Sequence, residues 1–147
     1  MSEFQRILIP TDGSEFTKDA VERGLSLAAM SGGSVTALYV IDQSAYSNPH
    51  VDAAVANAHD TLEREGACAT GYVADRGREM GVPVEAKVLE GTPSKVIIRE
   101  SKEYDAVVMG TLGRTGISKL LMGSVADKVI RGAECPVMVV RSRIGRG

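Results

Sequence analysis

A run of glycines with basic residues between them is the part of this sequence best suited to chemistry. Glycine has no Cβ, so its backbone can turn through positive φ and its N–H groups can approach a bound anion closely. Successive exposed amides form an anion-binding nest, and a helix N-terminus adds unpaired donors and ~+0.5 of a charge. A helix is expected to begin at Ser124, directly after the run, so the pattern predicts a phosphate site. The run contains Gly110, Gly113, Arg114, Gly116, Lys119 and Gly123.

The length of this segment also indicates a function. Residues 111–122 separate the fourth expected strand from the last expected helix. Such connections usually have roughly 2–6 residues, and longer ones are generally functional or disordered. Other phosphate-binding patterns fit worse, because residues 113–119 lack the Walker A spacing and no G-x-G-x-x-G follows the first strand. The H-x-G-H cluster of nucleotidyltransferases is absent as well, and we expect His50 and His59 to be isolated surface residues.

Five short apolar runs alternate with segments of helical period. Continuous rather than alternating apolar character is typical of strands that are buried on both faces. The alternation implies βαβ units, and we expect an α/β fold with an open parallel five-stranded sheet, order 3-2-1-4-5, and helices on both faces. The expected strands are Arg6–Pro10, Ser34–Val40, Val82–Leu89, Tyr104–Gly110 and Pro136–Arg141.

Capping residues and glycines mark the ends of the expected helices. Ser14 is expected to cap the first helix, which Gly32 and Gly33 end. A long helix is expected over residues 51–80, with a kink or a loose middle at Gly66 and Gly71. Its expected inner stripe is Val55, Ala58, Leu62, Ala69 and Val73. Thr92–Pro93 should open the third helix, and Ser124–Gly132 should form the last.

The expected strand order brings two groups of candidate residues together. Ligands of open α/β sheets bind at the carboxyl ends of the strands where the strand order reverses, here between the first and fourth strands. Pro10, Thr11 and Asp12 end the first strand, and the glycine run starts at the end of the fourth. Asp12 is a candidate for ligand contact, but an Asx turn with Gly13 or support of the following helix explains it too.

Length, charge and cysteine use narrow the class of protein. The 147 residues suit a single domain over 1–147, with a frayed tail at 141–147. The net charge of −2 argues against nucleic-acid binding through bulk electrostatics. Neither a signal peptide nor a membrane span is expected, and Cys68 and Cys135 suit a reducing compartment as buried structural thiols. A cytoplasmic protein is therefore expected.

Four blocks of the sequence resemble the universal stress protein family. Gly110, Gly113 and Gly123-Ser124 have the spacing G-x2-G-x9-G-S/T, which is the ATP-binding signature of that family. Residues 7–14 resemble its first strand and turn, residues 90–93 its G-x-P helix start, and residues 135–140 its terminal strand. The resemblance covers nearly the whole chain. It implies a Rossmann-like fold of the adenine nucleotide alpha hydrolase type that binds ATP, AMP or ADP, with Mg2+ or Mn2+ on the phosphates.

The resemblance also implies roles for single residues. Asp12 would contact the ribose hydroxyls or a metal ion carried by the phosphates, and Val40 would offer backbone groups to the adenine edge. Gly110 would lie against the ribose, and the phosphates would be bound by the amides of Gly113, Gly123, Ser124 and Val125. Arg114 would pair with a γ-phosphate, or is an exposed loop charge, and Ser124 with Asp127 also fits a capping box. The expected nucleotide site comprises Pro10, Thr11, Asp12, Val40, Met109, Gly110, Gly113, Arg114, Gly123, Ser124 and Val125.

The sequence is compatible with three functions. A nucleotide-dependent signalling or interaction module of the stress response fits best, because no second carboxylate or histidine is obviously placed to orient a hydrolytic water. The alternatives are a slow ATPase or phosphotransferase and an interaction protein that needs no nucleotide. An unknown protein partner is expected in each case. The family resemblance also implies a homodimer through the last strand, whose apolar residues would lie at a sheet edge. They are Val137, Met138, Val139 and Val140.

Overall fold

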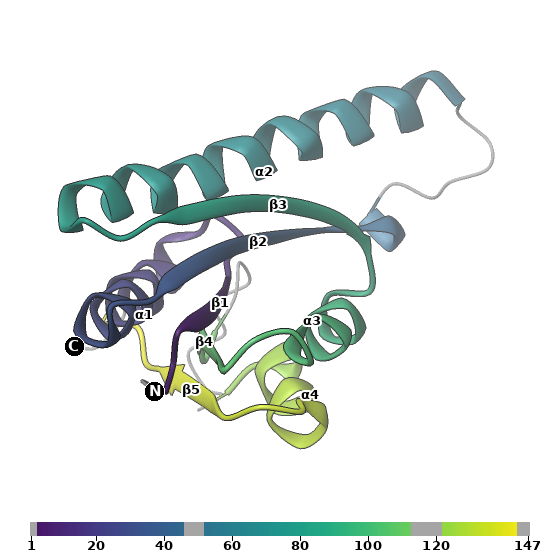
Figure 1. Cartoon of the computed structure of the whole chain (residues 1–147). Coiled ribbons are helices and arrows are strands. Elements are labelled where there is room, and N and C mark those ends of the chain that lie inside the picture. Colours follow the sequence, from purple (N-terminus) through teal and green to yellow (C-terminus); the bar gives the residue numbers. More distant parts are fainter. Residues whose placement is uncertain (1–2, 46–51, 113–121, 144–147) are drawn as a thin grey trace.

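Five parallel strands form one sheet in the order β3-β2-β1-β4-β5, as predicted. The computed structural model describes residues 3–45, 52–112 and 122–143. Its central strand β1 is buried from Ile7 onward and pairs with β2 and β4, while β3 and β5 are the edges (Figure 1). The strands are β1 Arg6–Pro10, β2 Ser34–Asp42, β3 Val84–Gly91, β4 Ala106–Gly110 and β5 Val137–Val140.

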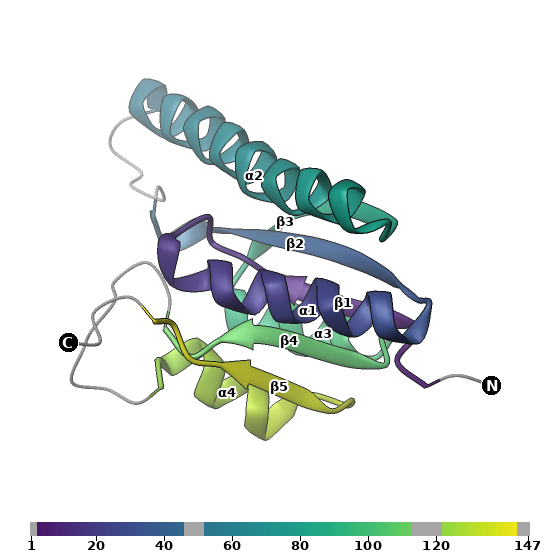
Figure 2. The ribbon, with the colours of Figure 1, turned by 90° about the vertical axis from the view of Figure 1, so that its left-hand side faces the viewer.

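Helices cover both faces of the sheet (Figure 2). Successive side chains of a strand point to opposite faces, so Ile7 and Ile9 pack with α1 and α2 whereas Leu8 packs with α3 and α4. The inner strands β1, β2 and β4 are mostly buried, which is why they read as continuous apolar runs, whereas the edge strands β3 and β5 are only partly buried. The helices are the 3-10 turn η1 Glu15–Thr17, α1 Lys18–Ser31, the 3-10 turn η2 Gln43–Ala45, α2 Asp52–Met80, α3 Pro93–Ser101 and α4 Ser124–Gly132.

The first helix begins later than predicted, and Ser14 does not cap it. Ser14 precedes η1, and α1 starts only at Lys18; the Ser14 side chain makes no cap hydrogen bond. Instead Asp12 Oδ1 accepts a hydrogen bond from the Ser14 amide at 2.9 Å, which closes a turn before η1. The predicted end of the helix is confirmed, because Gly32 adopts the left-handed conformation at φ 71°.

Helix α2 runs without interruption for 29 residues, so the predicted kink is wrong. A Cβ at Gly66 would lie 2.8 Å from the ring of Tyr39, whereas one at Gly71 would meet nothing within 4 Å. Gly66 therefore permits close packing of the helix on β2. The inner stripe is confirmed at Ala69 and Val73, which are buried, and at Leu62, which packs against Tyr39, Ile41 and Ala69. Val55 lies outside the described side chains.

Three smaller expectations are also wrong in part. Cys68 is exposed and Cys135 is half-buried, so they are not two buried thiols. The tail is ordered as far as Arg143, because Ser142 is buried and the Arg143 amide donates to Asp19 at 2.9 Å; residues 144–147 lie outside the description. His59 is half-buried and contacts acidic side chains, while His50 lies outside the description. Across the described ranges, no helix is both long and apolar enough to cross a membrane.

Candidate functional site

A cavity of about 420 Å³ opens at the carboxyl ends of β1, β2 and β4. Its position is the predicted one, between the first and fourth strands where the strand order reverses. Every predicted site residue that the structure describes lines this cavity, whereas Gly113 and Arg114 lie outside the described residues. The predicted lining residues are Pro10, Thr11, Asp12, Val40, Met109, Gly110, Gly123, Ser124 and Val125.

Sequence reasoning missed the walls that other elements contribute. Leu62 comes from α2, and Pro93 and Ile97 come from α3; how closely these helices approach the cavity is set by tertiary packing. Asp42 is also a lining residue, because β2 continues past Val40. Asp42 is thus a second carboxylate in the lining, and its Oδ1 accepts hydrogen bonds from the amide and hydroxyl of Ser44. The expectation that no second carboxylate is placed to orient a hydrolytic water stays a prediction.

The start of α4 provides unpaired backbone donors. Gly123 is the N-cap, one residue earlier than the capping-box interpretation requires, and Ser124 is the first helical residue without a side-chain cap bond. That interpretation is wrong; Asp127 lies instead 3.3 Å from Arg131. The first intrahelical bond runs from the Asp127 amide to the Gly123 carbonyl at 3.0 Å. The preceding amides of the first turn, from Ser124 to Ala126, have no acceptor within the helix and belong to residues that line the cavity.

The Gly123 amide joins the two ends of the glycine run and is therefore not a free donor for a ligand. It donates to the carbonyl oxygen of Thr111 at 2.6 Å. The implied use of this amide for a phosphate therefore does not match the structure. A Cβ at Gly123 would lie 3.2 Å from the same oxygen, and one at Gly110 would lie 3.2 Å from the carbonyl oxygen of Phe16. At both glycines the backbone of another segment approaches so closely that a Cβ would be tightly packed.

The end of β2 exposes a backbone edge to the cavity. Alternate residues of a parallel strand direct their N–H and C=O groups toward opposite neighbours. The Thr11 amide donates to the Leu38 carbonyl at 2.9 Å, so the backbone of Leu38 faces β1. Val40, two residues later, presents its backbone on the same side, beyond the last pair between the strands, Pro10 and Leu38. A flat ligand edge with one donor and one acceptor fits this position.

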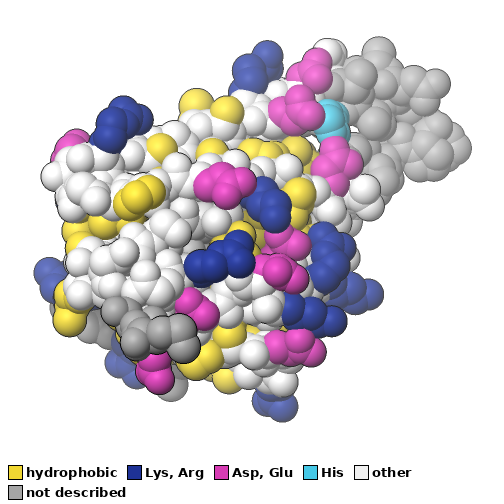
Figure 3. All heavy atoms as spheres, viewed as in Figure 1, with side chains coloured by type: hydrophobic (Ala, Val, Ile, Leu, Met, Phe, Trp, Pro, Cys, Tyr) yellow, Lys and Arg dark blue, Asp and Glu magenta, His cyan; other side chains and the backbone are white. Residues whose placement is uncertain are grey.

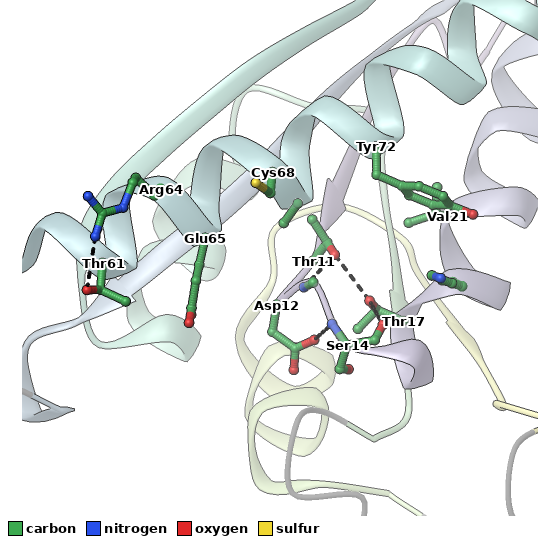
Figure 4. Close-up of a pocket in the computed structure, with 13 residues that line it drawn as sticks. Thr11, Asp12, Ser14, Thr17, Val21, Thr61, Arg64, Glu65, Cys68 and Tyr72 are labelled. Atoms are coloured by element: carbon green, nitrogen blue, oxygen red, sulfur yellow. Dashed lines mark hydrogen bonds between the residues drawn. The ribbon is translucent and has the colours of Figure 1, made fainter. Parts of the chain in front are cut away.

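The turn between β1 and α1 lines the first cavity and also a second one, which Figure 4 shows. Thr11 and Thr17 are joined through their hydroxyl oxygens at 3.1 Å, and the turn closes through Asp12 and Ser14. The second cavity, of about 530 Å³, lies between this turn and α2, where Arg64, Cys68 and Tyr72 line it. The Asx turn predicted at Asp12 and Gly13 is thus confirmed, closed by the Ser14 amide, and ligand contact by Asp12 stays a prediction.

Charge is unevenly distributed around the first cavity. Its charged lining residues are Asp12 and Asp42, and none of the lining residues within the described ranges is a lysine or an arginine. The positive charge or hydrogen-bond donors for an anionic ligand would therefore come from the first-turn amides of α4, from a cation bound with the ligand, or from Arg114 and Lys119. These two basic residues belong to the segment that the structure does not describe.

Comparisons with known proteins agree with this architecture. The model of the universal stress protein family matches residues 3–141. Universal stress protein MJ0531 of Methanocaldococcus jannaschii is 36% identical over 140 residues, which cover 94% of this chain and 82% of the relative. Universal stress protein UspA from Lactobacillus plantarum superposes with a TM-score of 0.82 at 26% identity, covering 96% of this chain and all of the other.

A more distant structure has the same fold and a bound ligand. It is a universal stress protein family protein from Arabidopsis thaliana with AMP bound, at 21% identity and a TM-score of 0.69, covering 95% of this chain and 93% of the other. The family model spans nearly the whole chain, and the strand order, the layers and the cavity at the reversal point accompany it. The chain belongs to the universal stress protein family.

Proposed function

We propose that this protein binds an adenine nucleotide, foremost ATP, in the cavity at the reversal point. The supporting observation is that two sets of backbone groups line the same cavity. The backbone of Val40, at the end of β2, could bind a base edge, and the first-turn amides of α4 could bind phosphates. The cavity volume of about 420 Å³ lies within the ~300–1,000 Å³ range typical of ligand sites. That the Arabidopsis family member carries AMP supports the choice of an adenine nucleotide.

Each part of the nucleotide has a suitable wall in this proposal. The backbone of Val40 would bind the adenine edge, and Gly110 would leave room for the ribose, with Asp12 available for its hydroxyls. The amides of Ser124 and Val125 would bind the phosphates, and Gly113 and Arg114 would add to them from the segment between. Gly123 keeps a structural role in closing that segment.

The phosphates would need a cation beside them. Two carboxylates line the cavity, so a triphosphate adds negative charge to an already negative wall. Mg2+ and Mn2+ favour oxygen ligands and are usually bound by one or two carboxylates together with phosphates. Asp12, at the turn, is the residue that would help to hold such an ion, whose contribution is charge neutralisation. We therefore expect ATP to bind more tightly with Mg2+ than with EDTA, and adenosine to bind equally in both.

The function we propose is a nucleotide-dependent signalling or interaction module of the stress response. Slow ATPase or phosphotransferase activity is the second candidate; Asp42 lines the same cavity, but it lies two residues beyond Val40, at the proposed adenine side, and its Oδ1 already accepts hydrogen bonds from Ser44. Turnover above ~1 s⁻¹, the lower end for kinases, would support that second candidate. A function without nucleotide is the third candidate, and native mass spectrometry of the purified protein distinguishes it by the absence of bound nucleotide.

Calorimetric titration with ATP and Mg2+ tests the proposal. We expect saturable binding at micromolar ligand, and loss of that binding in Gly123→Val, whose side chain would disturb the closure on Thr111. Gly71→Ala is the matched control, because its Cβ would meet nothing within 4 Å and Gly71 does not line the cavity. Absence of binding at millimolar ATP to the folded wild-type protein would overturn the proposal.

A homodimer through the last strand is part of the same proposal. Among the residues that the structure describes, strand β5 has a strand neighbour only on the β4 side, and its residues Met138 and Val139 are 44% and 37% exposed. An apolar strand with an unpaired edge is a template for pairing with another chain. A second copy that joins at this edge would cover these side chains.

A further inference from the structure

His59 links helix α2 to the edge strand β3 through carboxylates on both sides of its ring. Its Nε2 contacts Oε1 of Glu90, near the carboxyl end of β3. Its Nδ1 lies 3.7 Å from Oε1 of Glu63, one turn further along α2. In the space-filling view, acidic side chains border the histidine surface beside α2 (Figure 3). The imidazole is half-buried, so its orientation is restricted by its surroundings.

A third carboxylate completes a group with the dimensions of a metal site. Possible ligand atoms of His59, Asp60 and Glu63 all lie within 4.8 Å of one another. Two ligands that bind one zinc ion tetrahedrally at ~2.1 Å are about 3.4 Å apart. The Nδ1–Oε1 separation of 3.7 Å is close to this value, so small side-chain adjustments would bring these ligand atoms together.

Glu90 occupies the position of an orienting carboxylate. Histidines that bind a metal through one ring nitrogen usually donate the N–H of the other nitrogen to a carboxylate or a carbonyl. In the neutral imidazole, which is the form that binds a metal, contact of Nε2 with Glu90 favours the tautomer in which Nδ1, the nitrogen facing Glu63, carries the lone pair. A histidine held by a carboxylate from another element distinguishes this group from a cluster of acidic residues on one helix.

We propose that His59, Asp60 and Glu63 bind a divalent transition-metal ion of the zinc type, with Glu90 orienting the histidine. Imidazole nitrogen suits Zn2+, Co2+ and Ni2+, whereas Mg2+ and Ca2+ prefer oxygen ligands alone. Both carboxylates are exposed, so water completes the coordination. None of these four residues lines the nucleotide cavity, and the metal site is therefore separate from any ion that accompanies the phosphates.

A bound ion would also strengthen the attachment of α2 to the sheet. All three ligands lie on one stretch of α2, and the contact between His59 and Glu90 joins that stretch to β3. Leu62, within the same stretch, lines the nucleotide cavity. Binding of the metal should therefore raise the temperature of unfolding of the whole chain, because an ion that binds only the folded state stabilises it by mass action.

Titration of the nucleotide-free full chain with Zn2+, and with Co2+ as a spectroscopic probe, tests the metal site. We expect one ion per chain, no comparable binding of Mg2+ or Ca2+, and loss of at least tenfold in affinity in His59→Gln and in Glu63→Gln. His50→Gln is the matched control, since it removes the only other histidine of the chain. Glu90→Gln should weaken binding by ~10–100-fold while the stoichiometry stays the same, as is usual for an orienting carboxylate.

Two results would overturn this inference. One is Zn2+ binding that His59→Gln and His50→Gln reduce equally or leave unchanged, with circular dichroism showing that both variants fold. The other is binding that disappears when Cys68 and Cys135 are both replaced by serine, which would assign the ion to the thiols. Retention of one Zn2+ in that double variant, together with its loss in Glu63→Gln, supports the site.

Discussion

Ser124 has two groups that a phosphate could use, the backbone amide and the side-chain hydroxyl. The amide belongs to the first turn of α4, which has no acceptors within the helix for its donors. The hydroxyl makes no cap bond, so the two groups can be separated by substitution. Proline suits the first helical position, and Gly123 before it, at φ −74° and ψ 167°, already has the extended conformation that a residue before proline prefers.

We predict that Ser124→Pro folds normally but weakens ATP binding by about tenfold or more. The substitution removes one donor to a charged group, which is worth ~1.5–3 kcal/mol. Ser124→Ala keeps the amide and should change affinity less. Calorimetric titration of both variants measures the difference, and thermal unfolding checks the fold. Equal affinity of the proline variant and the wild type would show that this amide does not bind the ligand.

Glycine spacing predicted which residues share the cavity but not what each one does. The structure adds that the two ends of the segment from Gly110 to Gly123 meet, through the hydrogen bond from the Gly123 amide to the Thr111 carbonyl. Whether the Gly123 amide bonds within the chain or to a ligand depends on how the two ends of the segment meet. A local sequence pattern does not predict this. Ser14 and Ser124 were assigned as caps because serine is favoured there, yet a turn closed by Asp12 and an N-cap at Gly123 take these positions.

At the scale of elements, helix α2 shows how packing overrides propensity. Its two central glycines predicted a weak point, but a contact with β2 requires Gly66, and the rest of the helix is held by its buried stripe. The strand order and the two layers were predictable because buried strands and amphipathic helices have distinct periods. The approach of α2 and α3 to the cavity was not predictable, because it depends on which side chains meet across the sheet.

We predict opposite effects of alanine at the two glycines of α2. Gly71→Ala should stabilise the protein by ~0.5–1 kcal/mol, because the helix gains propensity and the new methyl group meets nothing. Gly66→Ala should destabilise it by ~1–3 kcal/mol, because its Cβ would lie 2.8 Å from the ring of Tyr39. Urea unfolding measures both. A stabilising effect at both positions would contradict the packing role of Gly66.

Glu22 joins α1 to α2 through a two-bond contact with Arg76. Nε and Nη2 of Arg76 donate to the two carboxylate oxygens at 2.6 and 2.9 Å. These bonds lower the pKa of Glu22 from its ordinary value of 4.5. Because the pKa of Glu22 is lower in the folded state, the contact with Arg76 contributes fully to the stability of the fold above the ordinary pKa. This contribution is lost as the pH falls through the folded-state pKa.

The stability difference between wild type and Glu22→Gln should therefore depend on pH. We expect the variant to have the lower unfolding midpoint at pH 7, and the difference to shrink as the pH falls below about 4. Asp75→Asn is a control, because its partner Arg78 lies on the same helix and joins no second element. A difference of constant size from neutral to acidic pH would refute a charged role for Glu22.

At the scale of the whole molecule, the two sheet edges differ. Among the described residues neither edge strand has a second strand neighbour, but β3 packs extensively on α2 and exposes Val88, whereas β5 packs less on the helices and exposes both Met138 and Val139. We predict a dimer by light scattering, and a monomer for Met138→Asp, because a charge at the centre of β5 opposes pairing. Met30, 85% exposed on α1, provides a control: Met30→Asp should remain dimeric. A monomeric wild type at tens of micromolar would contradict the proposed dimer.

Backbone amide chemical shifts with and without ATP and Mg2+ test most directly whether the nucleotide binds at the reversal point. The proposal predicts that the largest changes occur at Val40, Gly110, Ser124 and Val125, which line one cavity. Changes confined to Arg64, Cys68 and Tyr72, in the cavity on the other side of the Asp12 turn, would contradict it, as would unchanged shifts at saturating ligand.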